Sequence, residues 1–230
     1  MSIDDIVKLF DAITKLLNVL IWPGVILFIL IRFGEDLREF FSSLGELSIK
    51  GAGFEASLKR KQAEVVAALS AAAASKPDRD KTPESIAKEA MIATDVVAEV
   101  VTPRAIRRAR RSTVLWVDDN PHNNSYERQA LEALGVSFVL AKSTDEALKK
   151  IRKQRFDAII SDMGRPPDSQ AGYTLLDQLR SSGYQTPFII YAGLRDPEHV
   201  AESRRRGAIG CTNNPNELFE MVLSALGRAA

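Results

Sequence analysis

The chain has 230 residues, enough for one full domain and a smaller part, or for two small domains. Its apolar content of 45% and charged content of 27% are ordinary for a globular protein and argue against disorder throughout. A net charge of +1 gives no global reason to expect nucleic-acid binding. The single cysteine, Cys211, excludes an intramolecular disulfide and a cysteine-rich zinc site, and it fits a reducing cytosolic setting.

The first part of the chain contains an uncharged run from Leu16 to Ile31. With its apolar flanks the run covers about 13–33, close to the ~20 residues that cross a bilayer. We therefore expect residues 1–34 to carry one transmembrane helix. A buried core helix, or a helix packed in an oligomer, is the alternative. Pro23 and Gly24 at the centre of the run favour the membrane interpretation, because both are commoner in membrane helices than in soluble ones.

The basic residues around this run predict its orientation. Lys8 and Lys15 precede it, whereas the basic residues that follow it are Arg32, Arg38, Lys50, Lys59, Arg60 and Lys61. By the positive-inside rule we expect a single-pass protein of the inner (cytoplasmic) membrane, with its C-terminal domain in the cytoplasm.

Residues 35–111 are expected to form juxtamembrane helices and a linker. Two glycines in the segment KGAGFEA, residues 50–56, interrupt the helical pattern. A span followed by this segment resembles a short membrane-anchor module found in front of various bacterial cytoplasmic domains. A helix from Ala56 to about Ala74 comes next, and the polar residues 75–83, with two prolines, predict a flexible linker.

A further helix is expected from Pro83 to about Val101, started by Thr82 and by proline at the first helical position. Its apolar face has no partner in a domain of its own, so we expect it to pack on the following domain or to pair with its copy in a homodimer. A basic run then follows, consisting of Arg104, Arg107, Arg108, Arg110 and Arg111. Such a run is usually a solvated face, with contact to anionic lipid head groups or nucleic acid as alternatives. Without interleaved aromatic residues, a nucleic-acid partner is unexpected.

Residues 112–230 alternate between strands and helices. The predicted strands are Thr113–Val117, Ser137–Ala141, Phe156–Ser161, Pro187–Tyr191 and Ile209–Thr212. The predicted helices are Ser125–Leu134, a helix that starts at Ser143 and ends near Lys153, Tyr173–Ser181, Pro197–Arg206 and Asn216–Leu226. This alternation predicts an α/β fold, a doubly wound five-stranded parallel sheet of flavodoxin-like type with strand order 2-1-3-4-5.

Acidic residues follow two of these strands directly. Asp118 and Asp119 follow the first strand and Asp162 follows the third, which is its neighbour in the predicted order. We therefore expect the three carboxylates to converge at the carboxyl edge of the sheet, where hard oxygen ligands suit Mg²⁺. The alternative is that these aspartates only cap helices or solvate loops.

The same residues carry a resemblance to the receiver domain of two-component response regulators. The matching segments are Val114–Asp119, Ile159–Met163, Pro166, Gly172–Leu176, Pro187–Ile190, Gly207–Ala208 and Pro215. The resemblance implies that Asp162 is the phosphoacceptor. It also implies that Asp118, Asp119, Asp162 and the main-chain carbonyl of Gly164 bind the metal, with a histidine kinase or another signalling protein as partner.

Two positions depart from the family pattern. Ala192 stands where receivers usually have serine or threonine, and Asn214 stands where they usually have lysine. Tyr191, Thr212 and Arg165 are candidates to replace the missing groups. The departures leave two interpretations open, namely a membrane-anchored receiver that accepts a phosphoryl group at Asp162 with Mg²⁺, and a degenerate receiver that works by protein contact or by sensing a small ligand.

An enzyme is not expected. A nucleotide hydrolase on the same sheet would need a glycine-rich phosphate loop after the first strand, where residues 119–122 read DNPH instead. His122 is expected to be a loop residue and His199 a surface residue. The chain shows no kinase signature and no helix-turn-helix.

Overall fold

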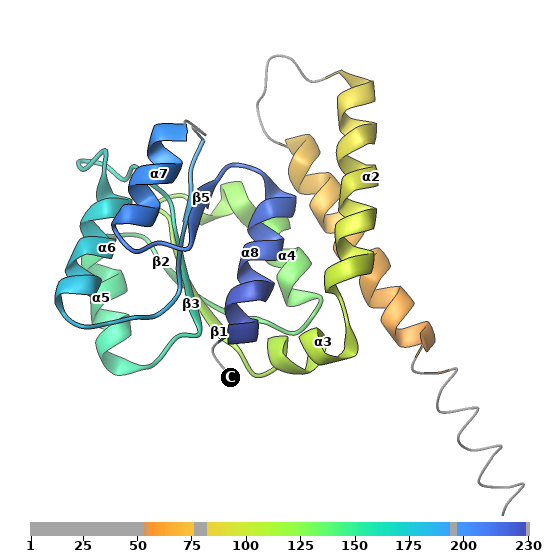
Figure 1. Ribbon diagram of the computed structural model, residues 1–230, viewed down its shortest axis with the longest axis horizontal. Helices are drawn as coiled ribbons and strands as arrows, with labels where there is room; N and C mark the ends of the chain where they lie inside the picture. The colour runs from red at the N-terminus through yellow and green to blue at the C-terminus, as the bar shows by residue number, and fades with distance from the viewer. Residues whose placement is uncertain (1–52, 54, 76–81, 194–196, 229–230) are drawn as a thin grey trace, which may run out of the picture. The chain divides into compact units, whose positions relative to one another are not determined.

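The computed structural model describes residues 53, 55–75, 82–193 and 197–228 (Figure 1). The chain divides into two units, Met1–Ala56 and Ser57–Ala230. Within the described ranges, no helix is both long enough and apolar enough to cross a membrane. The span predicted at about 13–33 and most of the 75–83 linker lie outside these ranges, and so does the KGAGFEA segment apart from three of its residues. The span and the membrane anchor therefore stay predictions.

Five parallel strands form one sheet in the order β2-β1-β3-β4-β5, which confirms the predicted topology. The strands are β1 Thr113–Val117, β2 Ser137–Ala141, β3 Ala158–Ser161, β4 Phe188–Tyr191 and β5 Gly210–Thr212. Val117 at the end of β1 pairs with Ala141 of β2 and with Ser161 of β3. The three strands therefore end level, and whatever follows β1 and β3 emerges at one edge.

The helices lie close to their predicted positions. They are α2 Pro83–Val100, α3 Pro103–Ala109, α4 Ser125–Glu132, α5 Thr144–Lys153, α6 Ala171–Ser181, α7 Pro197–Arg205 and α8 Pro215–Arg228. A helix over residues 55–75, called here the first helix, precedes them. Two predicted caps are present, because the Thr82 hydroxyl accepts from the N–H of Ser85 and the Ser143 hydroxyl accepts from the N–H of Glu146.

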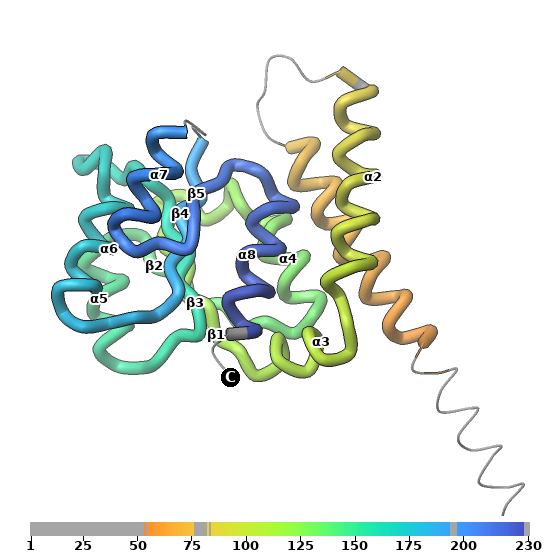
Figure 2. Tube along the Cα trace, viewed as in Figure 1, coloured from red at the N-terminus to blue at the C-terminus, as the bar shows by residue number. Residues whose placement is uncertain are grey.

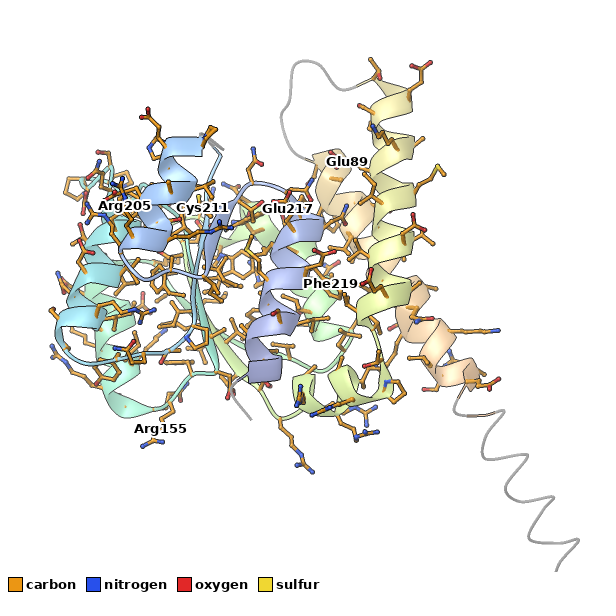
Figure 3. All side chains as sticks on the ribbon, in the orientation of Figure 1. Glu89, Arg155, Arg205, Cys211, Glu217 and Phe219 are labelled. Carbon is orange, nitrogen blue, oxygen red and sulfur yellow. The ribbon has the colours of Figure 1, made fainter. Side chains whose placement is uncertain are left out.

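The sheet is covered on both faces, which explains why its strands are almost continuously apolar. Val114 and Trp116 of β1 face α4 and α8, whereas Leu115 and Val117 face α5 and α6. Phe219, labelled on α8 in Figure 3, belongs to the first of these two clusters. Alternation along one strand thus supplies both hydrophobic layers.

The first helix and α2 form a pair that packs on the α4–α8 side of the domain (Figure 2). Leu69 of the first helix and Val97 of α2 are both 1% exposed and join the same cluster as α4 and α8. Polar contacts support the packing, because the Lys61 ammonium donates to the Ala133 carbonyl and the Asn216 amide donates to the Glu89 carbonyl (3.4 Å). The prediction that the helix after Pro83 packs on the following domain is confirmed.

Candidate functional site at the carboxyl edge of the sheet

Three carboxylates converge at the carboxyl edge of the sheet. Asp118 and Asp119 follow β1, Asp162 follows β3, and one carboxylate oxygen of each lies within 4.8 Å of the others. Asp118 is 4% exposed, Asp162 is partly buried and Asp119 is exposed. The convergence expected from the strand order is therefore present.

Main-chain N–H groups and one side-chain amide hold two of these carboxylates in place. The Asn120 N–H donates to Asp118 Oδ1 (2.7 Å), and the Asn124 amide donates to Asp118 Oδ2 (2.5 Å). The Met163 N–H donates to Asp162 Oδ1 (2.7 Å). Within the described part of the chain, Asp162 Oδ2 accepts no hydrogen bond. One oxygen of Asp162 is thus positioned while the other is available to a ligand.

The three charges influence one another. Burial raises the pKa of Asp162, and the neighbouring charges of Asp118 and Asp119 raise it further. The Met163 N–H and the Arg165 guanidinium act in the opposite direction without cancelling the increase. A bound cation would remove the repulsion, because it would sit among three negative groups.

The donor set fits Mg²⁺, which prefers carboxylate and carbonyl oxygens and keeps several waters of its own. Asp118, Asp119 and Asp162 offer three carboxylates, and an open side of the site leaves room for water. Among the described residues, no hydrogen bond reaches the carbonyl of Gly164, so that oxygen is not engaged elsewhere. The assignment of Gly164 as a ligand stays a prediction.

A pocket of about 820 Å³ opens beside the carboxylates. Its wall includes Tyr191, Ala192 and Gly193 at the end of β4, and Asn213 after β5. Ser75, at the end of the first helix, also lines it. The pocket is therefore bordered both by the carboxyl edge of the sheet and by the end of the first helix. His122 is exposed on the rim of the pocket, but it lies in a short 3-10 helix, η1 Pro121–Asn124, and not in the plain loop that the sequence predicted.

The side chains proposed as replacements for the missing switch groups are engaged elsewhere. The Tyr191 hydroxyl donates to Glu127 (2.7 Å), and both residues are buried. The Thr212 hydroxyl donates to Glu217 (2.7 Å). Asn214, which stands at the usual lysine position, caps α8, because its side-chain oxygen accepts a hydrogen bond from the N–H of Asn216 (2.8 Å). Tyr191 and Thr212 therefore do not supply a free hydroxyl to the pocket.

Arg165 has a structural role that its sequence position did not indicate. Its guanidinium is buried beneath the loop after β3 and donates to the Asp162 carbonyl (2.7 Å), the Ser161 hydroxyl (2.7 Å) and the Ala171 carbonyl (2.9 Å). Burial lowers its pKa, although the charge of Asp162 opposes this effect. Arg165 thus ties the main chain of Asp162 to the start of α6 and does not point at a ligand. These partners come together only in the fold, so no sequence pattern could have indicated the role.

A parallel sheet of order 2-1-3-4-5 with three converging carboxylates at its carboxyl edge is the arrangement expected of a signalling receiver domain. The sequence agrees, since residues 114–223 match the family described as the response regulator receiver domain. This part of the chain is therefore a response regulator receiver domain, a module of two-component signalling that typically binds Mg²⁺ at its acidic pocket.

Two curated relatives support the same assignment. The chain is 33% identical over 116 residues to "Probable C4-dicarboxylate response regulator DctR" of Priestia megaterium, which covers 50% of each protein. It is 34% identical over 101 residues to "Gliding motility regulatory protein" of Myxococcus xanthus, covering 43% of this chain and 12% of that one. The chain thus spans half or less of the length of these relatives.

Solved receiver structures are also similar to this part of the chain. The receiver domain of the Francisella response regulator 1452 has 27% identity and a TM-score of 0.48, covering 52% of this chain and 99% of that one. The chemotaxis response regulator CheY4 of Vibrio cholerae has 31% identity and a TM-score of 0.42, covering 52% and 98%.

Proposed function

We propose that this chain is a membrane-anchored single-receiver protein that accepts a phosphoryl group at Asp162 with Mg²⁺ bound by Asp118, Asp119, Asp162 and the Gly164 carbonyl. The observation that carries the proposal is the arrangement of the three carboxylates, in which Asp162 Oδ1 is held by the Met163 N–H and Oδ2 is left to a ligand. The donor is a histidine kinase or another phosphorylated signalling protein.

In the proposed reaction, an oxygen of Asp162 forms a bond to phosphorus while the bond from phosphorus to the donor nitrogen breaks. A bound Mg²⁺ supplies charge neutralisation for the phosphoryl oxygens. Asp118, fixed by Asn120 and Asn124, holds its position during the transfer. The Arg165 guanidinium holds the main chain of Asp162 in place by donating a hydrogen bond to its carbonyl.

A degenerate receiver is the second candidate, and one observation favours it. Ala192 offers no hydroxyl at the pocket wall, and Asn214 caps α8 instead of reaching the carboxylates. Tyr191 and Thr212 donate to Glu127 and Glu217, so neither offers a free hydroxyl that could report phosphorylation. Such a domain would act by protein contact or by binding a small ligand.

Intact-mass measurement separates the two candidates. The full chain is incubated with Mg²⁺ and acetyl phosphate, beside Asp162→Ala and a control, Asp145→Ala, which removes an exposed carboxylate from the first turn of α5. We expect one phosphoryl group on the wild type and the control, and none on Asp162→Ala. If the wild type stays unmodified under conditions that phosphorylate an ordinary receiver, the result contradicts phosphorylation at Asp162 and supports the degenerate receiver.

The membrane part of the proposal has its own test. We expect the full chain in the inner-membrane fraction, resistant to alkaline carbonate and released by detergent, with the receiver domain accessible to protease only from the cytoplasmic side. Recovery of the full chain in the soluble fraction without detergent would contradict the anchor and leave the receiver chemistry untouched.

A further inference from the structure

Four arginines gather on one side of α3 and the turn that follows it. Arg104, Arg107, Arg108 and Arg111 are spaced by three, four and seven residues, which places them on one helical face. All four line a cavity of about 490 Å³, together with Ser112, Asp157 and Leu226. These four residues are called the arginine face.

The charge of the arginine face is not neutralised by its surroundings. In the part of the chain that the structure describes, none of its four guanidinium groups forms an ion pair. Asp157 is the one acidic residue among those that line the cavity, and its Oδ2 already accepts a hydrogen bond from the Thr113 N–H (2.7 Å). Glu220 lines an adjoining cavity that Arg104 and Arg108 also border. Even with both of these carboxylates counted, the four arginines leave an excess of positive charge.

The cavity is built by tertiary packing as well as by the helix. Arg108 is partly buried, and a Cβ placed on Gly227 of α8 would lie only 3.2 Å from its Nη1 atom. The main-chain carbonyl of Arg108 also accepts a hydrogen bond from the Ser112 hydroxyl (2.9 Å). Because α8 approaches so closely, it forms one wall of the cavity beside the arginine face. A solvated run of charges on an isolated helix would have no such wall.

This cavity is distinct from the acidic pocket. Ser112 stands directly before β1 and Asp157 directly before β3, whereas Asp118 and Asp162 directly follow the same two strands. In parallel strands these positions are at opposite edges of the sheet, and α3 lies at the lower end of the view in Figure 1. A ligand at the arginine face therefore does not depend on the phosphorylation chemistry.

We propose that the arginine face is a binding site for a multiply charged phosphate group, carried by a soluble organic phosphate or by an anionic lipid head group. Guanidinium groups donate paired hydrogen bonds to phosphate oxygens, and they are more weakly hydrated than ammonium groups. The cavity accommodates a phosphate and part of the group that carries it. No aromatic side chain lines the cavity, so a stacked nucleic-acid base has no platform there.

The test uses pyrophosphate as the probe. The full chain in zwitterionic detergent is titrated with pyrophosphate and followed by calorimetry. The buffer contains EDTA, which removes divalent metal ions and so prevents metal-assisted phosphate binding at the acidic pocket. The variant Arg107→Gln/Arg111→Gln alters two exposed members of the arginine face. The control Arg152→Gln/Lys153→Gln removes the same charge from exposed positions at the end of α5.

We expect the wild type and the control to bind pyrophosphate with similar affinity, and the Arg107/Arg111 variant to bind at least about tenfold more weakly. Adding phosphatidic acid, whose phosphomonoester head group can carry two negative charges, to the micelles then distinguishes the sources. Displacement of pyrophosphate indicates a lipid head group, and unchanged binding indicates a soluble phosphate. Absence of pyrophosphate binding to the wild type overturns the proposal. Equal weakening in the control also overturns it, because the effect would then reflect net charge alone.

Discussion

Replacing Asp119 by asparagine is expected to stabilise the metal-free protein. The carboxylate of Asp119 is exposed, and no hydrogen bond to it is found among the described residues, so the change removes charge without removing a contact. The three carboxylates have oxygens within 4.8 Å of one another. At that distance each pair repels by about 0.9 kcal/mol in a water-like dielectric and about 3.5 kcal/mol at an effective dielectric of 20. Because Asp119 is exposed and salt screens it, we expect a total gain of about 1–2 kcal/mol from the two pairs.

Thermal unfolding followed by circular dichroism measures the effect. A gain of this size raises Tm by about 2–8 °C in a chain of this length, in EDTA at neutral pH. Mg²⁺ is expected to reverse the order, because it stabilises the wild type by binding and finds one ligand fewer in the variant. Asp145→Ala, outside the carboxylate group, serves as the control. A lower Tm for Asp119→Asn in EDTA, or a wild type indifferent to millimolar Mg²⁺, would refute the electrostatic reasoning.

The pH dependence of the metal-free protein follows from the raised pKa of Asp162. Burial, and then the charge of Asp118, raise the pKa of Asp162 in the folded protein above its value in the unfolded chain. The folded state therefore holds this proton more tightly, and stability falls as the pH increases from the ordinary carboxyl pKa through the raised one. We expect Asp162→Asn to flatten this part of the pH–stability curve, and saturating Mg²⁺ to do the same for the wild type.

Three further changes test the packing around the site. Gly172→Ala would place a Cβ 2.9 Å from a main-chain carbonyl oxygen. We therefore expect it to lower the free energy of unfolding in denaturant by about 1–3 kcal/mol and to weaken Mg²⁺ binding measured by calorimetry. Gly193→Ala, which has open space around the new Cβ, should change neither. Tyr191→Phe removes the hydroxyl that donates to Glu127, and leaving that buried carboxylate without this donor should cost about 1–3 kcal/mol in the same unfolding assay. Leu69→Ala should cost about 2–5 kcal/mol and make the first helix more sensitive to limited proteolysis, and unchanged protection would contradict its packing on the domain.

The sheet and the carboxylates were predictable because they depend on local patterns. The run Thr113–Val117 is apolar throughout and ends at two aspartates, and the strand bounds agree with the prediction for β1 and β2. Where the prediction began β3 at Phe156, pairing starts two residues later at Ala158, since Asp157 uses its side chain and N–H to hold Thr113 at the sheet's other edge. A buried phenylalanine looks like strand in the sequence even when its main chain is not paired.

Contacts between residues far apart in the chain were not predictable. Tyr191 and Glu127 are 64 positions apart, and each is unremarkable in its own segment. Arg165 stands in the loop after β3, yet its guanidinium is buried, where three separate segments bring oxygen atoms to it. Burying a charged residue costs free energy, and hydrogen bonds to the charged group offset that cost. Whether such a residue is buried therefore depends on all of its partners together.

The helix pair limits how another protein can approach the receiver domain. The first helix and α2 cover α4 and α8 with buried side chains such as Leu69 and Val97, so displacing them would expose a large apolar surface. A partner that leaves the pair in place can still contact the domain over α5, α6 and α7, at the acidic pocket, or at the arginine face. Because Ser75 lines that pocket, the proposed phosphodonor would approach Asp162 beside the end of the first helix. We therefore expect access to Asp162, the proposed phosphoacceptor, to depend on the position of the first helix.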